Sequence, residues 1–349
     1  MSLRPEAPAS AAEPFAPPRW LRNPHLQSVL ASSALRRWLG GDLRAAFERE
    51  AEQVLLECGD GVRLQGLHSR QSVLPQARGL VVLLHGWEGS VASSYLLRTG
   101  AGLRAAGFDV FRLNFRDHGD THHLNEELFH SNRIDEVVAA VAQLAQRHAG
   151  QALAVAGFSL GGNFALRVAL RAPAAGIPLR HAVAVCPVIS PAQGLRAIEA
   201  APWFYEGYFL RKWRGSLLRK RSLFPQRYDF APTELRRSLR ELTRWLVERH
   251  TDFGTLERYL DGYSIAGDRL AALAVPASIL TSADDPVIDA ADFAHLQLPP
   301  HAAVEVAAHG GHCGFIENAR CDGFAERWVA DRLEAALAAG VAPSAPGHA

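Results

Sequence analysis

The sequence predicts an α/β fold, in which a mostly parallel sheet is covered by helices on both faces. Two observations predict it. Short apolar runs alternate with segments of helical spacing along most of the 349 residues, and strands that alternate with helices form right-handed crossover units. Several of the runs, such as 80–84 and 182–186, are continuously apolar, which is typical of strands covered on both faces.

The amino-acid composition limits the classes of protein to which the chain can belong. Hydrophobic residues make up 48% of the chain and charged residues 21%, and the net charge is +1, so nothing indicates a nucleic-acid partner. Four scattered cysteines, without metal-ligand or disulfide spacing, favour a reduced, cytoplasmic location. No apolar run is long enough for a transmembrane segment. Residues 1–18 and 341–349 are predicted to be disordered tails.

A helical arm is predicted to precede the sheet. Asn23-Pro24 marks a turn and a helix start, and the segment to about residue 39 is expected to be helical. A Gly-Asp-Gly turn then joins two alternating segments, which predicts an antiparallel hairpin. The hairpin strands are expected at 53–57 and 62–68, further strands at 79–84, 110–115, 277–281 and 304–307, and helices at 95–106, 134–147 and 321–338.

The segment Gly157-Phe158-Ser159-Leu160-Gly161 lies between a short buried strand at 153–156 and a helix at 162–170. A strand, a Gly-x-Ser-x-Gly turn and a helix form the nucleophile elbow of an α/β-hydrolase. In so tight a turn, side chains at the glycine positions would collide with the neighbouring strand and helix. The turn would hold the Ser159 hydroxyl at a helix N-terminus, where the dipole favours developing negative charge. Ser159 is therefore the predicted nucleophile.

Residues 190–263 interrupt the alternation, because they contain no strand pattern. Aromatic and basic residues concentrate between residues 203 and 221, a composition typical of a lid over an active site. Trp203, Phe204 and Tyr208 are the candidate substrate-pocket residues, and the segment is compatible with transient contact at a membrane surface. The alternative is a helical cap with a solvated basic face. We therefore expect a hydrolase core at 19–189 and 264–340, with a helical lid or cap at 190–263.

A serine nucleophile needs a general base and an acid that orients it, and in α/β-hydrolases the chain order is serine, acid, histidine. Two loops downstream of Ser159 satisfy this order, each after a predicted strand. The first contains Asp284, preferred as the acid because it directly follows its strand, and Asp285, the alternative acid. The second contains His312, the predicted general base. His309, three residues earlier, is a weaker candidate for the base.

The oxyanion that forms during attack needs backbone N–H donors. One is predicted to be Leu160, which follows the nucleophile. The other is predicted to be Trp87, in the His85-Gly86-Trp87 loop after the strand at 79–84. Gly86 would let the backbone approach the site.

Histidine and aspartate residues cluster in the loop 117–123, with His130 nearby. Such a cluster suggests a metal site, but the loop offers no helical i, i+4 pair and no second cluster with ligand spacing. We therefore expect the loop to shape the rim of the pocket or to hydrogen-bond with its neighbours. No metal and no cofactor is predicted.

Taken together, these motifs resemble the YheT-like branch of the α/β-hydrolases, from about Arg22 to the final helix. The Asn-Pro-His-Leu-Gln motif is specific to this branch, since nothing in catalysis demands it. The segments that carry the resemblance are Asn23-Pro24-His25-Leu26-Gln27-Ser28, His85-Gly86-Trp87-Glu88-Gly89, Asn114-Phe115-Arg116, His130-Ser131, Gly157-Phe158-Ser159-Leu160-Gly161-Gly162-Asn163, Asp284-Asp285-Pro286 and Gly310-Gly311-His312-Cys313-Gly314-Phe315.

The resemblance implies ester hydrolysis by a triad, here Ser159, Asp284 and His312. Some relatives act on lipids or phospholipids, and some transfer acyl groups to alcohols. Family members commonly have a glycine-rich loop where this chain has residues 117–123, so substrate preference does not carry over. The eukaryotic relatives have an N-terminal membrane anchor that this sequence does not show, so the resemblance does not imply membrane residence.

The sequence thus predicts a cytoplasmic serine hydrolase that cleaves carboxylic esters through an acyl-enzyme. The expected partner is a small-molecule ester with a medium or long acyl group, or another lipid-like ester. One alternative is acyl transfer to an alcohol on the same triad, because the steps before deacylation are identical. The other is a non-catalytic binding protein on the hydrolase fold.

Overall fold

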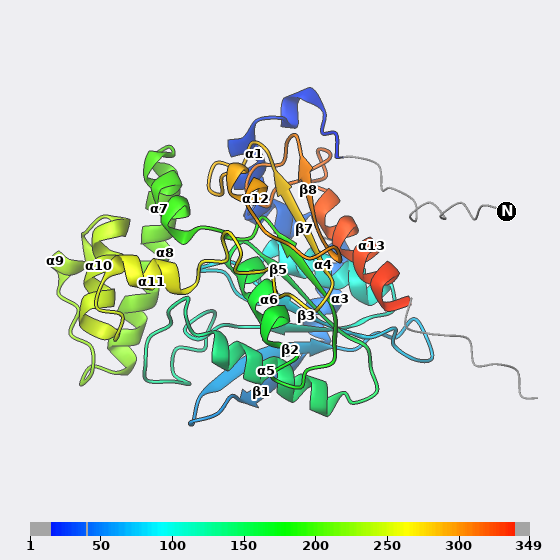
Figure 1. The fold of residues 1–349 in the computed structure, drawn as a ribbon, viewed down its shortest axis with the longest axis horizontal. Helices are drawn as coiled ribbons and strands as arrows, with labels where there is room; N and C mark the ends of the chain where they lie inside the picture. Colours follow the sequence, from blue (N-terminus) through cyan, green and yellow to red (C-terminus); the bar gives the residue numbers. More distant parts are fainter. Residues whose placement is uncertain (1–14, 40, 339–349) are drawn as a thin grey trace, which may run out of the picture.

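The computed structural model describes residues 15–39 and 41–338. Its eight-stranded sheet has the order β1-β2-β4-β3-β5-β6-β7-β8 (Figure 1). The pairs β1–β2 and β2–β4 are antiparallel, and every pair from β4 to β8 is parallel. The predicted mostly parallel sheet is confirmed. The strands are β1 Glu52–Glu57, β2 Arg63–Ser69, β3 Leu80–Leu84, β4 Asp109–Leu113, β5 Leu153–Phe158, β6 Leu179–Val185, β7 Ala277–Ser282 and β8 Ala302–Ala307.

Helices cover both faces of the sheet because the central strands are apolar on both sides. In β3, Leu80, Val82 and Leu84 pack into the core under α5 and α6, whereas Val81 and Leu83 pack into the core under α4 and α13. This alternation follows from the two-residue period of a strand. The helices of the core are α3 Gly41–Arg49, α4 Ser94–Ala105, α5 Ile134–Arg147, α6 Leu160–Arg171, α12 Ala291–Ala294 and α13 Phe324–Ala338.

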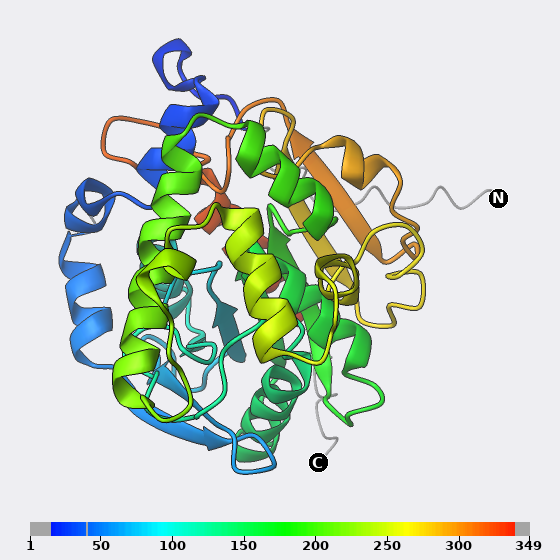
Figure 2. The same ribbon diagram turned by 90° about the vertical axis from the view of Figure 1, so that its left-hand side faces the viewer.

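The chain between β6 and β7 forms a helical insertion, residues 191–262, to the left of the sheet in Figure 1 and facing the viewer in Figure 2. Its basic residues are not all solvated, because Lys220 is fully buried. The Lys220 ammonium donates to Asp117 Oδ1 at 2.7 Å and so fixes the insertion to the loop after β4. The insertion helices are α7 Pro191–Ala200, α8 Phe204–Leu223, α9 Pro232–Leu235, α10 Leu239–His250 and α11 Leu256–Gly262.

The N-terminal arm is divided into short helices rather than one. They are η1 Arg19–Leu21, α1 Pro24–Ala31 and α2 Ala34–Trp38. The predicted tail boundary at residue 18 is corrected, because Phe15 is buried with its ring 5.5 Å from that of Phe315. The predicted tails at 1–14 and 341–349 lie outside the described residues. Among the described helices, none is both long and apolar enough to cross a membrane.

Candidate active site

Ser159 occupies a strained turn between β5 and α6, with φ 54° and ψ −120°. Two glycines are required for this turn. A Cβ atom on Gly157 would lie 2.1 Å from the Gly161 carbonyl oxygen, and one on Gly161 would lie 2.3 Å from the Leu84 carbonyl oxygen. The Ser159 amide donates to the Val185 carbonyl at 2.9 Å, which anchors the turn to β6. Residues 157–161, hereafter the elbow, therefore hold Ser159 by local contacts in the middle of the sheet.

The Ser159 hydroxyl lies beside the predicted base, with Oγ 2.8 Å from His312 Nε2. The other ring nitrogen, Nδ1, lies 2.9 Å from Asp285 Oδ2 and 3.2 Å from Oδ1. This arrangement requires a proton on Nδ1 and leaves Nε2 free to accept the serine proton. The serine, histidine and aspartate side chains thus form one continuous chain of hydrogen bonds.

The preference for Asp284 over Asp285 is corrected by these distances. Asp284 contacts the neighbours of His312 instead: its Oδ1 accepts the Gly311 amide at 2.9 Å, and its Oδ2 lies 3.4 Å from Nδ1 of His309, the weaker candidate for the base. Asp285 turns inward because its Oδ1 also accepts the amides of Val287 and Ile288, at 2.8 and 3.0 Å. Such an aspartate turn fixes the direction of the carboxylate. The Asp285 side chain is fully buried.

The charge of Asp285 changes the titration of His312. Burial by itself would lower the pKa of His312, but the charge of the nearby Asp285 carboxylate, with smaller contributions from Cys313 and from the Asp285 hydrogen bond, outweighs burial and raises the pKa to about 9. The aspartate therefore stabilises the protonated imidazole, which is the form a general base reaches after it accepts a proton.

The loop after β3 passes directly over the nucleophile. A Cβ atom on Gly86 would lie 3.3 Å from Ser159 Cβ. The Gly86 amide donates to the Tyr95 hydroxyl at 2.9 Å, and the Glu88 amide donates to His118 Nε2 at 3.2 Å. Burial lowers the pKa of His118 to about 4, which keeps its ring neutral and able to accept. Hydrogen bonds to Tyr95 and His118 thus fix Gly86 and Glu88, the residues on either side of Trp87.

The two predicted oxyanion donors belong to this region. Leu160 begins α6, so its amide has no partner one turn earlier in the helix. Among the described residues, neither the Trp87 nor the Leu160 amide donates to another protein group. Sequence reasoning missed the role of Tyr95 and His118, since neither belongs to a recognised catalytic motif.

The histidine-rich loop is held by ordinary hydrogen bonds. His122 Nε2 lies 2.8 Å from the Ser216 hydroxyl, and Asp117 pairs with Lys220. Within the described chain, the only group of three metal-ligating side chains is His312 with Cys186 and Cys313, whose ligand atoms lie within 4.8 Å of one another. Because Ser159 and Asp285 already engage both nitrogens of His312, this arrangement is organised for proton transfer.

Comparison with known proteins agrees with the observed fold. A family model described as alpha/beta hydrolase fold matches residues 79–319, more than half of the chain. The chain belongs to the α/β-hydrolase fold family. This α/β-hydrolase is YheT-like: it is 27% identical over 313 residues to the protein of Escherichia coli (strain K12) named "Putative esterase YheT", covering 88% of each chain.

Solved structures show the same fold at lower identity. The 2,6-dihydroxy-pseudo-oxynicotine hydrolase superposes with a TM-score of 0.57 at 18% identity, over 86% of this chain and 74% of that chain. The Pyrococcus furiosus esterase Pf2001 superposes with a TM-score of 0.52 at 18% identity, over 83% of this chain and 90% of that chain.

In this α/β-hydrolase, two cavities meet at Ser159. The inner cavity has a volume of about 120 Å³ and extends under the insertion, lined mainly by apolar side chains such as Leu195, Ile198 and Trp213. The outer cavity has a volume of about 690 Å³ and lies between the arm and α8, with His312 in its wall. Ser159 lines both cavities and thus faces two spaces of different volume.

The three aromatic pocket candidates are placed differently. Phe204 and Tyr208 line the outer cavity. The prediction that Trp203 lines the pocket is wrong, because 85% of its surface is exposed and it lines neither cavity. It directly precedes α8, and its exposed side chain lies outside both cavities.

Proposed function

We propose that this α/β-hydrolase is a serine esterase that cleaves carboxylic esters with a medium or long acyl group through an acyl-enzyme. The observation that carries the proposal is the hydrogen-bonded chain from Ser159 Oγ through His312 to the buried Asp285 carboxylate. A serine joined to a base that a third group orients is the arrangement that nucleophilic acyl transfer requires. The name of the Escherichia coli relative is in keeping with this activity.

The reaction begins when Ser159 Oγ attacks the ester carbonyl carbon while its proton passes to His312 Nε2, 2.8 Å away. The carbon–oxygen bond to the alcohol then breaks, and the alkoxide leaves with the proton from His312. Water attacks the acyl-enzyme in the same way, giving its proton to His312, and the carboxylic acid is released as Ser159 regains a proton. Asp285 stabilises the imidazolium in both halves of the reaction.

The negative charge on the carbonyl oxygen is stabilised by the amides of Trp87 and Leu160. Two features support this assignment: the loop containing Trp87 passes over Ser159, and Leu160 lies at the N-terminus of α6. Tyr95 and His118 hold the amides on either side of Trp87, so its own amide is fixed before the substrate arrives. Such preorganised donors each contribute about 3 kcal/mol to the transition state.

The parts of the ester on the two sides of the scissile bond are assigned to different cavities. We assign the acyl chain to the inner cavity, because its walls are mostly apolar and each buried methylene contributes about 0.8 kcal/mol. The alcohol part belongs in the outer cavity, which is larger and has polar groups such as Lys212 in its wall. The insertion forms the roof of the inner cavity and acts as a lid over the acyl chain.

A chain-length series tests this assignment. With p-nitrophenyl esters from acetate to octanoate, kcat/KM should rise about fourfold for each methylene that enters the inner cavity. Ile198→Trp, which fills this cavity, should lower the rate on octanoate and spare the rate on acetate, which serves as the internal control. A preference of the unmodified enzyme for acetate would contradict the assignment of the acyl chain.

A further inference from the structure

The Asn23–Ser28 motif, hereafter the arm motif, starts a helix. The Asn23 side chain accepts the amides of His25 and Leu26 at 2.9 and 3.0 Å, and Pro24 occupies the first helical position. These are the features that fix a helix N-terminus. The first half of the arm motif therefore sets the position and direction of α1, and with them the side chains one turn later.

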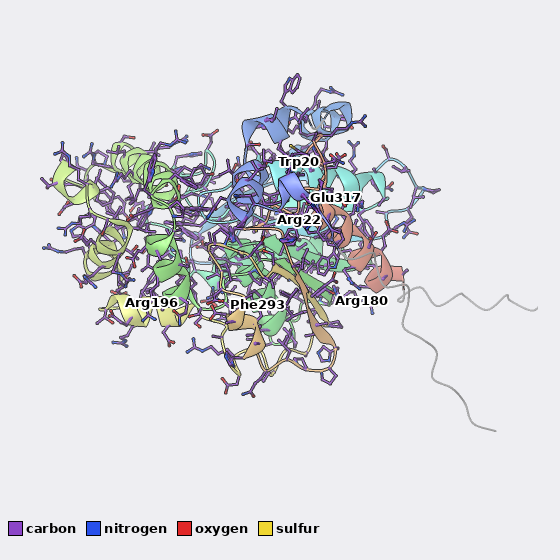
Figure 3. All side chains as sticks on the ribbon, turned by 90° about the horizontal axis from the view of Figure 1, so that it is seen from above. Trp20, Arg22, Arg180, Arg196, Phe293 and Glu317 are labelled. Atoms are coloured by element: carbon purple, nitrogen blue, oxygen red, sulfur yellow. The ribbon has the colours of Figure 1, made fainter. Side chains whose placement is uncertain are left out.

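Gln27 joins α1 to the chain that follows the catalytic histidine. Its side chain is fully buried. Its Nε2 donates to the carbonyls of Leu21 and Ile316 at 2.8 and 3.0 Å, and its Oε1 accepts the Ile316 amide at 2.7 Å. Both polar groups of Ile316 are thus bonded to one side chain of the arm. In the view of Figure 3, Trp20 and Arg22 of the arm and Glu317, the residue after Ile316, fall in the same region, and Leu21 and Ile316 share one apolar cluster.

Ser28 contacts the catalytic histidine itself. Its hydroxyl accepts the His312 amide at 2.8 Å and donates to the Pro24 carbonyl at 2.7 Å. Because the hydroxyl proton is directed to the carbonyl within α1, the oxygen lone pair is directed to His312. One serine side chain thereby connects the backbone of the helix to the backbone of His312.

The two backbones are also in direct contact. A Cβ atom on Gly311 would lie 2.3 Å from the Pro24 carbonyl oxygen, and one on Gly314 would lie 2.7 Å from the Gln27 carbonyl oxygen. Residues 310–315, hereafter the histidine loop, contain three glycines, so the loop is intrinsically permissive. Its conformation therefore depends on contacts from outside the loop.

The arm also reaches the insertion. His25 Nδ1 lies 3.1 Å from the Tyr205 hydroxyl at the start of α8. Ser28 and Tyr205 both line the outer cavity together with His312. The arm motif thus contacts the proposed general base through Ser28 and the insertion through His25.

We propose that the arm motif positions His312 for proton transfer, with Ser28 as the positioning residue. This proposal rests on the proposed esterase function, in which His312 is the general base. Asp285 orients the imidazole through Nδ1, but it does not fix the backbone from which the ring extends. Ser28 supplies that second constraint at the His312 amide itself. On either side of His312, Asp284 and Ser282 hold Gly311, and Gln27 holds Ile316. Geometry of this kind must be kept within about 0.5 Å for efficient catalysis.

The test compares Ser28→Ala, Ser28→Thr and Ser222→Ala in the full-length protein. Ser222 is the matched control, because it is an exposed serine in α8 whose hydroxyl donates to the Arg219 carbonyl one turn earlier. Hydrolysis of a p-nitrophenyl ester is measured as kcat and KM per folded molecule, with the folded fraction taken from thermal melting. Ser28→Ala should lower kcat about 10- to 100-fold with KM unchanged. Ser28→Thr, which keeps the hydroxyl, and Ser222→Ala should stay within about threefold of the unmodified enzyme.

Three results would overturn the proposal: an unchanged kcat in Ser28→Ala, an equal loss in Ser222→Ala, or a loss in Ser28→Ala that Ser28→Thr does not restore. Failure of the esterase function is a separate result, since the unmodified protein would then hydrolyse no ester. An active unmodified enzyme with a fully active Ser28→Ala variant refutes only the role of the arm.

Discussion

The elbow and the histidine loop carry the proposed nucleophile and the proposed general base, but they are held in different ways. The elbow is fixed by residues close to it in sequence and by the strands on either side, and its own glycines allow the strained serine. The histidine loop is held by Ser28 at His312, and the residue after it, Ile316, is held by Gln27; both partners lie more than 280 positions earlier in the chain. Asp284 and Asp285, each 27 positions earlier, bond Gly311 and His312.

This difference separates two kinds of preorganisation. A locally determined turn carries its geometry in a short motif, so a single wrong side chain there breaks the turn and the fold around it. A loop held by remote partners can keep the fold while losing the orientation of its catalytic group. We therefore expect variants of the elbow to affect stability, and variants around the histidine loop to affect turnover.

The largest expected effect comes from Asp285, the acid that bonds His312. Asp285→Asn removes the charge that stabilises the imidazolium and should lower kcat about 10⁴-fold. Asp284→Asn is the matched control, because the new amide oxygen still accepts the Gly311 amide. The kcat of this variant should fall by less than about tenfold. Steady-state kinetics on one ester decides between them. The reverse ranking would show that Asp284 is the functional acid.

Next in size is the effect of a methyl group in the elbow. Gly161→Ala places a Cβ against the Leu84 and His85 carbonyls and should lower the free energy of unfolding by about 3 kcal/mol or more. Gly102→Ala is the control: Gly102 lies in α4 with nothing within 4 Å of its added Cβ. The free energy of unfolding of Gly102→Ala should be higher than that of the unmodified protein by up to about 1 kcal/mol. Equal unfolding midpoints in denaturant would contradict a sterically enforced elbow.

A smaller and graded effect is expected from pH. The proposed general base must be neutral to accept the serine proton, and the pKa of His312 is raised to about 9, chiefly by the Asp285 carboxylate. As pH falls below 9, kcat/KM should therefore fall about tenfold per pH unit. A profile that is already flat at pH 7 would contradict this coupling between Asp285 and His312.

Stability should move in the opposite direction over the same range. A folded-state pKa above the ordinary value of 6.5 means that protonated His312 stabilises the fold below pH 6.5, and that this contribution is lost as pH rises through 9. Denaturant unfolding at several pH values should show this loss in the unmodified protein, and His312→Gln should remove it. An identical pH dependence in both proteins would refute this linkage.

The sequence predicted most of the features that depend on residues close together in the chain. The order of strands and helices, the strained serine and the histidine base follow from short motifs whose meaning depends on nearby residues. The choice between Asp284 and Asp285 could not be predicted, because it depends on which carboxylate is turned inward by the amides of Val287 and Ile288.

The sequence also could not predict which way the side chains of the insertion and the arm point. Trp203 and Phe204 are adjacent aromatics, yet only Phe204 lines the outer cavity. Lys220 looked like a solvated basic residue and is fully buried against Asp117. The arm motif was visible as a pattern, but its contact with His312 joins residues 284 positions apart, and no local rule specifies such a contact.

The proposed triad is tested most directly by covalent labelling with a fluorophosphonate, followed by intact-protein and peptide mass spectrometry. We predict one adduct per molecule on Ser159, no adduct in Ser159→Ala, and labelling in Asp285→Asn that is much slower than in Asp284→Asn. Full labelling of Ser159→Ala, or an unmodified protein that takes no label, would contradict the assignment of Ser159 as the nucleophile.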